Sequence, residues 1–507
     1  MKFLQAISLC SALIIHAGAC SPAAPASTVD GGTDGGGDPP LPPGTPVTGT
    51  EITNTIRDTG STMVPDDLTL NTIAALVPRP SGRFTTIAGL GNADGTFTIP
   101  NVPEGTYYLQ YGFPGFTYNY IVTSSHRLDF GTDSVGRSDV SYGASTTTLS
   151  LALSGLSPWG TKDHVEMLSS NSGAYCYSLN DQTSPPAAGA TTLTATKLNY
   201  PGYCYPGQLI DGTKSDLAYV YQLSTKTSPV LGAYTALTNS LLLPTNFSVV
   251  NAQDNPVTAT LAAVPQNSFS TRFAISQFEQ LAAAGTPGAQ VSGTYLLLES
   301  QPGGLAYGPF STSADLIEVL STPGAADKDT GALSYGNPFP TSWGTYANVI
   351  TGFNVSYTLP NAPSPLTVQG SIIYAADAST LGATGLTPPI GPVRNIKVNG
   401  QPATSLLANV TTTPTITFDP PALGTPTSYF ITVAGVTVSG GMLGTRVVAL
   451  FRTQGTSITV PPGPLALGAA YVVSISAQYA PKDSFDAPLR KRFPQASAAS
   501  ISSVLEP

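Results

Sequence analysis

Hydrophobic and polar positions alternate in short runs along most of this chain. In "DGTFTIPNVPEGTYYLQY" the side chains of Phe97 and Ile99 stand at alternate positions, and Tyr107 and Leu109 repeat the pattern after a turn. Such alternation places one face of an extended strand in a core. The turn segment "NVPEGT" contains proline, which fixes φ, and glycine, which accepts a left-handed conformation. The stretch therefore predicts two strands joined by a tight turn.

The same pattern recurs in three regions that we take as folded: residues 49–137, 138–379 and 386–507. The middle region contains runs such as "TTTLSLALSGL", "SDLAYVYQL" and "NVITGFNVSYTL". Only "SQFEQLAAAG" predicts a helix, with Ser276 as its N-cap and Gly285 at its end. A chain of 507 residues is too long for one hydrophobic core. We therefore expect an all-β, multi-domain chain of β-sandwiches.

Composition supports this fold class and narrows the range of partners. Only 10% of the residues are charged, whereas the chain has 51 glycines and 46 prolines, as many strands joined by turns require. The net charge is −9, and the only basic cluster is the short "RKR" at residues 490–492. Because phosphate binding needs a positive patch, nucleic acid is not expected as a partner.

The first twenty residues, "MKFLQAISLCSALIIHAGAC", combine Lys2, an apolar run and small residues before Cys20. This pattern indicates an export signal. Residues 21–48, "SPAAPASTVDGGTDGGGDPPLPPGTPVT", contain almost no large apolar side chain, so we expect a disordered tether. The export signal is either that of a lipid-anchored protein, as the next resemblance implies, or an ordinary cleaved signal peptide in which Cys20 has no role.

The end of this leader resembles the lipobox of bacterial lipoproteins, with Ala17, Gly18 and Ala19 before Cys20. The resemblance implies that residues 1–20 are a lipoprotein signal peptide and that Cys20 is lipidated. It also implies an extracytoplasmic protein anchored in the cell envelope by lipid, at the outer membrane or cell surface. Two or more acyl chains suffice for stable anchoring.

Two further resemblances concern the end regions. In residues 49–137, the string Asp94-Gly95-Thr96-Phe97 followed by "TIPNVPEGTY" is similar to the core of the carboxypeptidase regulatory-like domain, which implies a prealbumin-like β-sandwich without catalytic residues of its own. In residues 386–507, "LALGAAYVVSISA" resembles a fibronectin type III domain, and Tyr471 would form its tyrosine corner. Another kind of β-sandwich is the alternative for the last region. Residues 138–379 resemble no family that we identify.

Cys176 and Cys204 lie in matching contexts, "AYCYS" and "GYCYP". In an exported chain whose other two cysteines belong to the leader and its lipidated end, this pair predicts one disulfide. Two separate buried thiols are the alternative.

Chemistry-bearing motifs are scarce. Only His126 and His164 lie beyond the leader, and no zinc-ligand, nucleophile or phosphate-loop motif occurs. We expect no catalytic residue, no metal and no cofactor, and we interpret Asp163 and His164 as polar surface. Glu166, Glu299 and Glu318 lie beside strand-like runs and keep open a glycoside hydrolase, which needs two facing carboxyl groups.

Binding is the function that the sequence favours. Flat aromatic rings stack on sugars, and the candidate rings are Trp159, Trp343, Tyr118 and Tyr120. The leading hypothesis is a non-enzymatic surface protein that displays sandwich modules to a glycan or a cell-surface protein. The alternatives are a dedicated carbohydrate-binding protein and a hydrolase with an unrecognised carboxylate site in the middle region.

Overall fold

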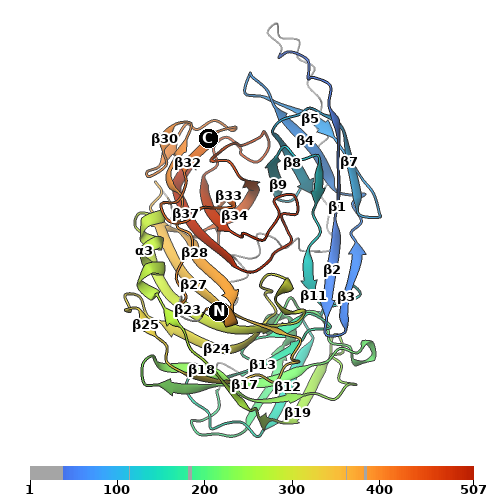
Figure 1. Cartoon of the computed structure of the whole chain (residues 1–507), viewed down its shortest axis with the longest axis vertical. Coiled ribbons are helices and arrows are strands. Elements are labelled where there is room, and N and C mark those ends of the chain that lie inside the picture. Colours follow the sequence, from blue (N-terminus) through green and yellow to red (C-terminus); the bar gives the residue numbers. More distant parts are fainter. Residues whose placement is uncertain (1–37, 114, 181–184, 361, 363, 382–384) are drawn as a thin grey trace.

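The computed structural model confirms an all-β, multi-domain protein built from packed sheets (Figure 1). It describes residues 38–113, 115–180, 185–360, 362, 364–381 and 385–507. The leader, Cys20 and most of the expected tether lie outside these residues. The tether was expected to extend to residue 48, but the first strand, β1, already begins at Thr45, because the side chain of Val47 is fully buried in the first core.

Three sandwiches are formed in the same way: a small sheet packs on part of one 19-stranded sheet, as counted over the described residues. In the first region, sheet β10-β1-β7-β6 faces strands β4, β5, β8 and β9 of the large sheet, and a separate sheet β11-β2-β3 extends beside them. The strand bounds are β1 Thr45–Thr50, β2 Ile52–Arg57, β3 Gly60–Pro65, β4 Thr72–Pro78, β5 Phe84–Ala88, β6 Leu90–Gly91, β7 Thr96–Val102, β8 Tyr107–Gly112, β9 Tyr118–Thr123, β10 Arg127–Asp129 and β11 Asp133–Val135.

The stretch that predicted two strands and a tight turn shows how this sandwich forms. Phe97 and Ile99 of β7 and Tyr107 and Leu109 of β8 are buried in one core, as their alternation predicted. The two strands do not pair with each other, however. β7 pairs with β1 and β6, whereas β8 pairs with β4 and β9. The turn at Gly105, whose φ is 108°, therefore carries the chain from one sheet to the facing one.

In the middle region, sheet β15-β12-β19 packs on β13, β14 and β17 around a core that includes Trp159. The large sheet continues through long strands beside α3, shown at the left of Figure 1. The strand bounds are β12 Thr148–Ser154, β13 His164–Ser169, β14 Ala174–Cys176, β15 Leu193–Asn199, β16 Cys204–Tyr205, β17 Tyr219–Ser228, β18 Gly232–Leu242, β19 Asp254–Thr260, β20 Ala262–Ala263, β21 Gln266–Phe269, β22 Arg272–Phe273, β23 Gln290–Gln301, β24 Ala314–Ser321, β25 Lys328–Asp329, β26 Leu333–Gly336, β27 Gly344–Tyr357 and β28 Leu366–Asp377.

The predicted helix is present as α3 (Ile275–Gly285), but its N-cap was assigned wrongly. The helix begins one residue before Ser276, and Ala274 at the N-cap offers no side-chain hydrogen bond. The carboxylate of Asp327 instead accepts a hydrogen bond from the Ser276 backbone N–H at 2.8 Å. A residue from a distant loop thus satisfies a helix end that local sequence leaves open. Among the described residues, the other helical turns are α2 Tyr200–Tyr203, η2 Gly212–Lys214, η3 Gly304–Ala306 and η4 Ala378–Thr380.

In the last region, sheet β30-β29-β32-β35 faces strands β33, β34, β36 and β37 of the large sheet. Tyr471 on β36 is buried, and its hydroxyl accepts a hydrogen bond from the Ala466 backbone N–H at 2.8 Å. This is the contact that a tyrosine corner requires. The strand bounds are β29 Arg394–Val398, β30 Gln401–Pro402, β31 Leu407–Ala408, β32 Thr415–Asp419, β33 Ser428–Ser439, β34 Met442–Thr453, β35 Ser457–Thr459, β36 Tyr471–Tyr479 and β37 Gln495–Glu506.

The regions are joined by strand pairing across the expected boundaries. β9 of the first region pairs in parallel with β34 of the last, where Tyr120 stacks on Phe451 with ring centroids 4.8 Å apart. β28 of the middle region pairs antiparallel with β37 of the last. One sheet therefore passes through all three regions.

Candidate functional site

A buried polar cluster lies on the strands β13, β17 and β24 of the middle region. His164 and Glu166 are two residues apart on β13, so they share a face of the strand, while Val165 and Met167 point into the core beneath β12, β15 and β19. Glu318 approaches the same point from β24. The sequence placed the two glutamates beside strand-like runs and gave no sign that they meet His164.

The geometry of the cluster is close. Nε2 of His164 lies 3.4 Å from Oε1 of Glu166 and 3.7 Å from Oε2 of Glu318. The Glu166 side chain is fully buried, and the His164 and Glu318 side chains are 7% and 10% exposed. Burial alone would lower the pKa of His164, but the two carboxylates, Glu318 above all, raise it to about 10. Without another cation, the imidazole is therefore protonated at neutral pH and bridges the carboxylates.

Tyrosines surround these charges. The rings of Tyr177 and His164 are 5.2 Å apart, and the Tyr175 hydroxyl donates a hydrogen bond to Asp315 at 2.9 Å. Burial raises the pKa of Tyr175 and Tyr221 well above the ordinary value, so both phenols stay neutral. The three ligand atoms of His164, Glu166 and Glu318 lie within 4.8 Å of one another, as the donors of a bound metal ion do.

The structure corrects the expectation that Asp163 and His164 lie at the surface. It also brings together two of the three glutamates considered for a carboxylate site. Asp163, which directly precedes β13, and His164, its first residue, are buried rather than polar surface. Asp163 accepts hydrogen bonds from Thr225 and Gln222, while His164 meets Glu166. Of the three candidate carboxylates, Glu166 and Glu318 meet at His164. Glu299 lies elsewhere on the sheet, where its Oε2 accepts a hydrogen bond from Asn348 at 3.1 Å.

Three of the four aromatic rings proposed for sugar binding are buried instead. Trp159 is 5% exposed within the middle core, and Tyr120 is 2% exposed against Phe451. Trp343 is 7% exposed, stacks on Phe339 and donates its Nε1–H to Asp58 at 2.8 Å. Only Tyr118 keeps an intermediate exposure. Large flat rings bury the most apolar area, and sandwich cores take them for that reason.

A more open site lies between the first and last regions. A cavity of about 620 Å³ is bounded by the ends of β8 and β9, the turn after β34 and the loop near residue 485. Its lining is mostly hydroxyl-bearing and includes Thr106, Thr123, Ser125, Gln454, Phe485 and Asp486. Because both end regions supply its walls, the sequence of either one alone offers no signal for this groove.

The disulfide predicted in the middle region is present. Cys176 and Cys204 stand opposite each other on β14 and β16 and are bonded.

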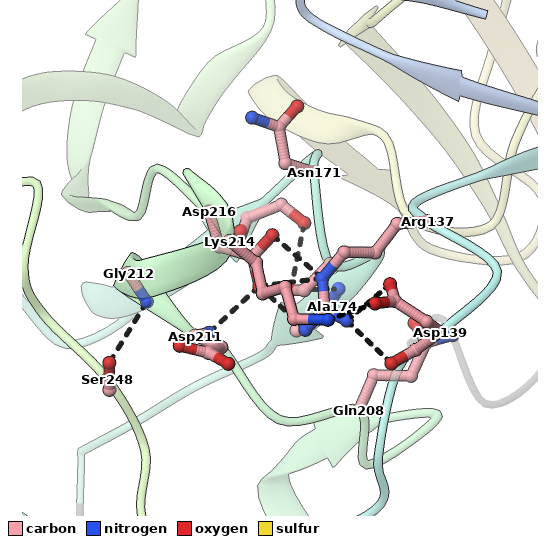
Figure 2. A network of polar contacts seen from close by, with 12 residues as sticks. Arg137, Asp139, Asn171, Ala174, Gln208, Asp211, Gly212, Lys214, Asp216 and Ser248 are labelled. Atoms are coloured by element: carbon pink, nitrogen blue, oxygen red, sulfur yellow. Dashed lines mark hydrogen bonds and ion pairs between the residues drawn. The ribbon is translucent and has the colours of Figure 1, made fainter. Parts of the chain in front are cut away.

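A network of ion pairs surrounds Arg137, which lies between the buried carboxylate of Asp216, 3.1 Å away, and Asp139, 2.8 Å away (Figure 2). Hydrogen bonds from Lys214 and Arg137 lower the pKa of Asp139 to about 2. This network fixes the chain segment that leads from the first region into the second.

Comparison with known proteins assigns no family. No protein-family model and no curated protein matches the sequence. Among solved structures, one similar chain is a tetra-tandem repeat from the extending region of a large adhesion protein, with 12% identity over 90% of this chain and 99% of that one, and a TM-score of 0.13. Another is trypsin-activated alpha-2-macroglobulin from Escherichia coli, with 10% identity, 92% of this chain covered and a TM-score of 0.13. The match spans 40% of that macroglobulin.

Proposed function

We propose that this chain is an exported surface protein that is anchored by lipid at Cys20 and binds a partner through its folded body. The observation that carries the proposal is the buried disulfide between Cys176 and Cys204, because such bonds persist in oxidising compartments outside the cytoplasm. The leader pattern, which ends in small residues before Cys20, agrees with export and lipidation. The regulatory-like and fibronectin-like resemblances of the end regions fit modules that position a partner rather than transform it. Among the described residues, no helix is long and apolar enough to cross a membrane.

The test is detergent partition of the protein made in its own type of host, a bacterium with lipoprotein processing. Wild-type protein should enter the detergent phase, and Cys20→Ser should move it to the aqueous phase or leave the leader uncleaved. Cys10→Ser, which changes the other cysteine of the leader, is the matched control and should leave partition unchanged. A Cys20→Ser protein that is processed and still partitions into detergent would overturn the anchor.

The groove between the end regions favours a second candidate, carbohydrate binding. Its hydroxyls, the Gln454 amide and the Asp486 carboxylate can hydrogen-bond sugar hydroxyls, and Phe485 adds an aromatic edge. Gln454 and Asp486 are exposed, so their replacement by alanine leaves the cores intact. In a glycan-array assay, the double variant should retain at least fivefold less of any glycan that the wild type binds, whereas Asp329→Ala on exposed β25 should bind normally. Equal retention by both variants would exclude the groove.

A further inference from the structure

The cluster of His164, Glu166 and Glu318 contains two carboxyl groups but only one basic group, the imidazole. Among the described residues, the ion-pair partner of both glutamates is His164, and no lysine or arginine joins them. Asp315, held by Tyr175, adds a further carboxylate nearby. Buried carboxylates are costly unless they are paired or coordinate a metal. Two carboxyl groups thus converge on one imidazole, with no other basic side chain beside them among the described residues.

The donor atoms are also short of hydrogen bonds. Among the described residues, neither carboxylate oxygen of the fully buried Glu166 meets strict hydrogen-bond geometry, and neither do Nε2 of His164 and the hydroxyl of Tyr221. The phenols of Tyr175 and Tyr221 and the His164 imidazole are nevertheless close enough to interact with Glu166. Buried polar atoms are nearly always satisfied in folded proteins. Buried polar atoms that converge on one point without full hydrogen bonding form a donor set that a cation could use.

The atoms behind the donors hold them in the orientation that metal ligands need. Nδ1 of His164 lies 3.2 Å from the backbone carbonyl of Lys162, so an Nδ1–H tautomer leaves the Nε2 lone pair directed at the glutamates. Glu318 is oriented in turn by the Thr235 hydroxyl, which donates to Oε2 at 2.9 Å. Such outer contacts are the usual support of metal-binding histidines and carboxylates.

The spacing fits a small transition-metal ion. With bonds of about 2.0 to 2.2 Å, two ligand atoms of a tetrahedral ion stand about 3.4 Å apart. The measured separations from Nε2 of His164 are 3.4 Å and 3.7 Å. One imidazole and two carboxylates suit Zn²⁺ better than Ca²⁺ or Mg²⁺, which prefer oxygen alone.

We propose that His164, Glu166 and Glu318 bind one Zn²⁺ ion, which ties β13 to β24 inside the middle region. β17 and β18 separate these strands in the sheet, and in a flat sheet their backbones would be about 14 Å apart. The ion stabilises the curvature of the sheet that brings the three side chains together. Its role is structural, because none of the three ligand side chains is more than 10% exposed. The site is independent of the surface function proposed above.

The test uses the full mature chain without an affinity tag, stripped with chelator and titrated with Zn²⁺ in a calorimeter and in thermal unfolding. One ion should bind per chain and raise the melting temperature by several degrees. Glu318→Gln and Glu166→Gln should each weaken binding at least tenfold. Co²⁺ should report the same site through its visible absorption.

The chain offers a matched control in its other His–Glu contact among the described residues, where Nε2 of His126 lies 4.0 Å from Glu104 at the surface. His126→Gln and Glu104→Gln should leave the affinity unchanged. Circular dichroism shows whether each variant is folded; if Glu166→Gln fails to fold, the less buried Glu318→Gln decides. Absence of stoichiometric Zn²⁺ or Co²⁺ binding by the folded wild type would overturn the proposal. Unchanged affinity in folded Glu318→Gln would do the same.

Discussion

The carboxyl group of Glu51 makes the stability of the first sandwich depend on pH. Glu51 lies between β1 and β2 in the chain, and the residue is 8% exposed. Burial, and then the nearby carboxylate of Asp66, raise the pKa of Glu51 from 4.5 to about 7. The Tyr111 phenol faces the same carboxyl. In this pH window the folded protein holds a proton that the unfolded chain releases, so stability falls as pH rises from about 4.5 to about 7.

Glu51→Gln should remove this contribution. The difference between the two pKa values, 4.5 and about 7, corresponds to about 3 kcal/mol of unfolding free energy. Urea denaturation at pH 5 and pH 8 should therefore show the wild type losing up to that amount relative to Glu51→Gln. Glu104→Gln, at a side chain that is 80% exposed, is the control. Parallel pH profiles for wild type and Glu51→Gln would contradict the assignment.

At the scale of elements, short strands in the middle region depend on covalent support. β14 and β16 have three and two residues, and their pairing consists of Tyr175 opposite Tyr205 and Cys176 opposite Cys204. So short a ladder contributes few hydrogen bonds. The disulfide closes a loop of 28 residues and restricts the unfolded chain.

Replacing both cysteines by alanine should lower the unfolding free energy by about 3 to 4 kcal/mol. Chemical denaturation of the exported protein measures this loss. Adding reductant to the denaturing wild type should reproduce it, whereas reductant should not affect the double variant. A double variant as stable as the oxidised wild type would show that β14 and β16 hold without the bond.

At the scale of the whole molecule, charges tie the first region to the last. Asp133 on β11 is 5% exposed and receives Arg492 at 2.7 Å and Arg490 at 3.4 Å, while Arg490 also meets Asp129 at 2.7 Å. Asp58 of the first region accepts hydrogen bonds from Ser170 and Trp343 of the middle region. These contacts and the shared sheet make the three sandwiches one body.

Asp133→Asn should therefore destabilise the whole chain rather than one region. It removes the buried partner of two arginines that are themselves partly solvated, which should cost about 2 kcal/mol. Single-tryptophan variants, Trp159→Phe and Trp343→Phe, would report unfolding at two separate places in the middle region. In both variants, Asp133→Asn should lower the unfolding midpoint by the same amount. Asp329→Asn should leave the midpoint unchanged. A midpoint that Asp133→Asn leaves unchanged in both single-tryptophan variants would mean that the middle region unfolds independently of the first and last regions.

Local pattern determined the strands, their inward faces and the helix of this protein. Phe97, Ile99, Tyr107 and Leu109 are buried as their alternation predicted, because the side-chain period of a strand is set by backbone geometry alone. The disulfide followed from the small number of cysteines and their context. The hydroxyl contact of Tyr471 was also predictable, since its partner is five residues away.

Only the tertiary structure decided which strands pair and which polar groups meet. β7 and β8 belong to two facing sheets, and β9 pairs with β34. The side chain of Trp343 is buried in the core. His164 and Glu318 are 154 positions apart in the chain (318 minus 164) but 3.7 Å apart in space. Alternation states that a side chain points inward, but not what it will meet there. That depends on the order and curl of the strands between, which arise from the packing of the whole sheet.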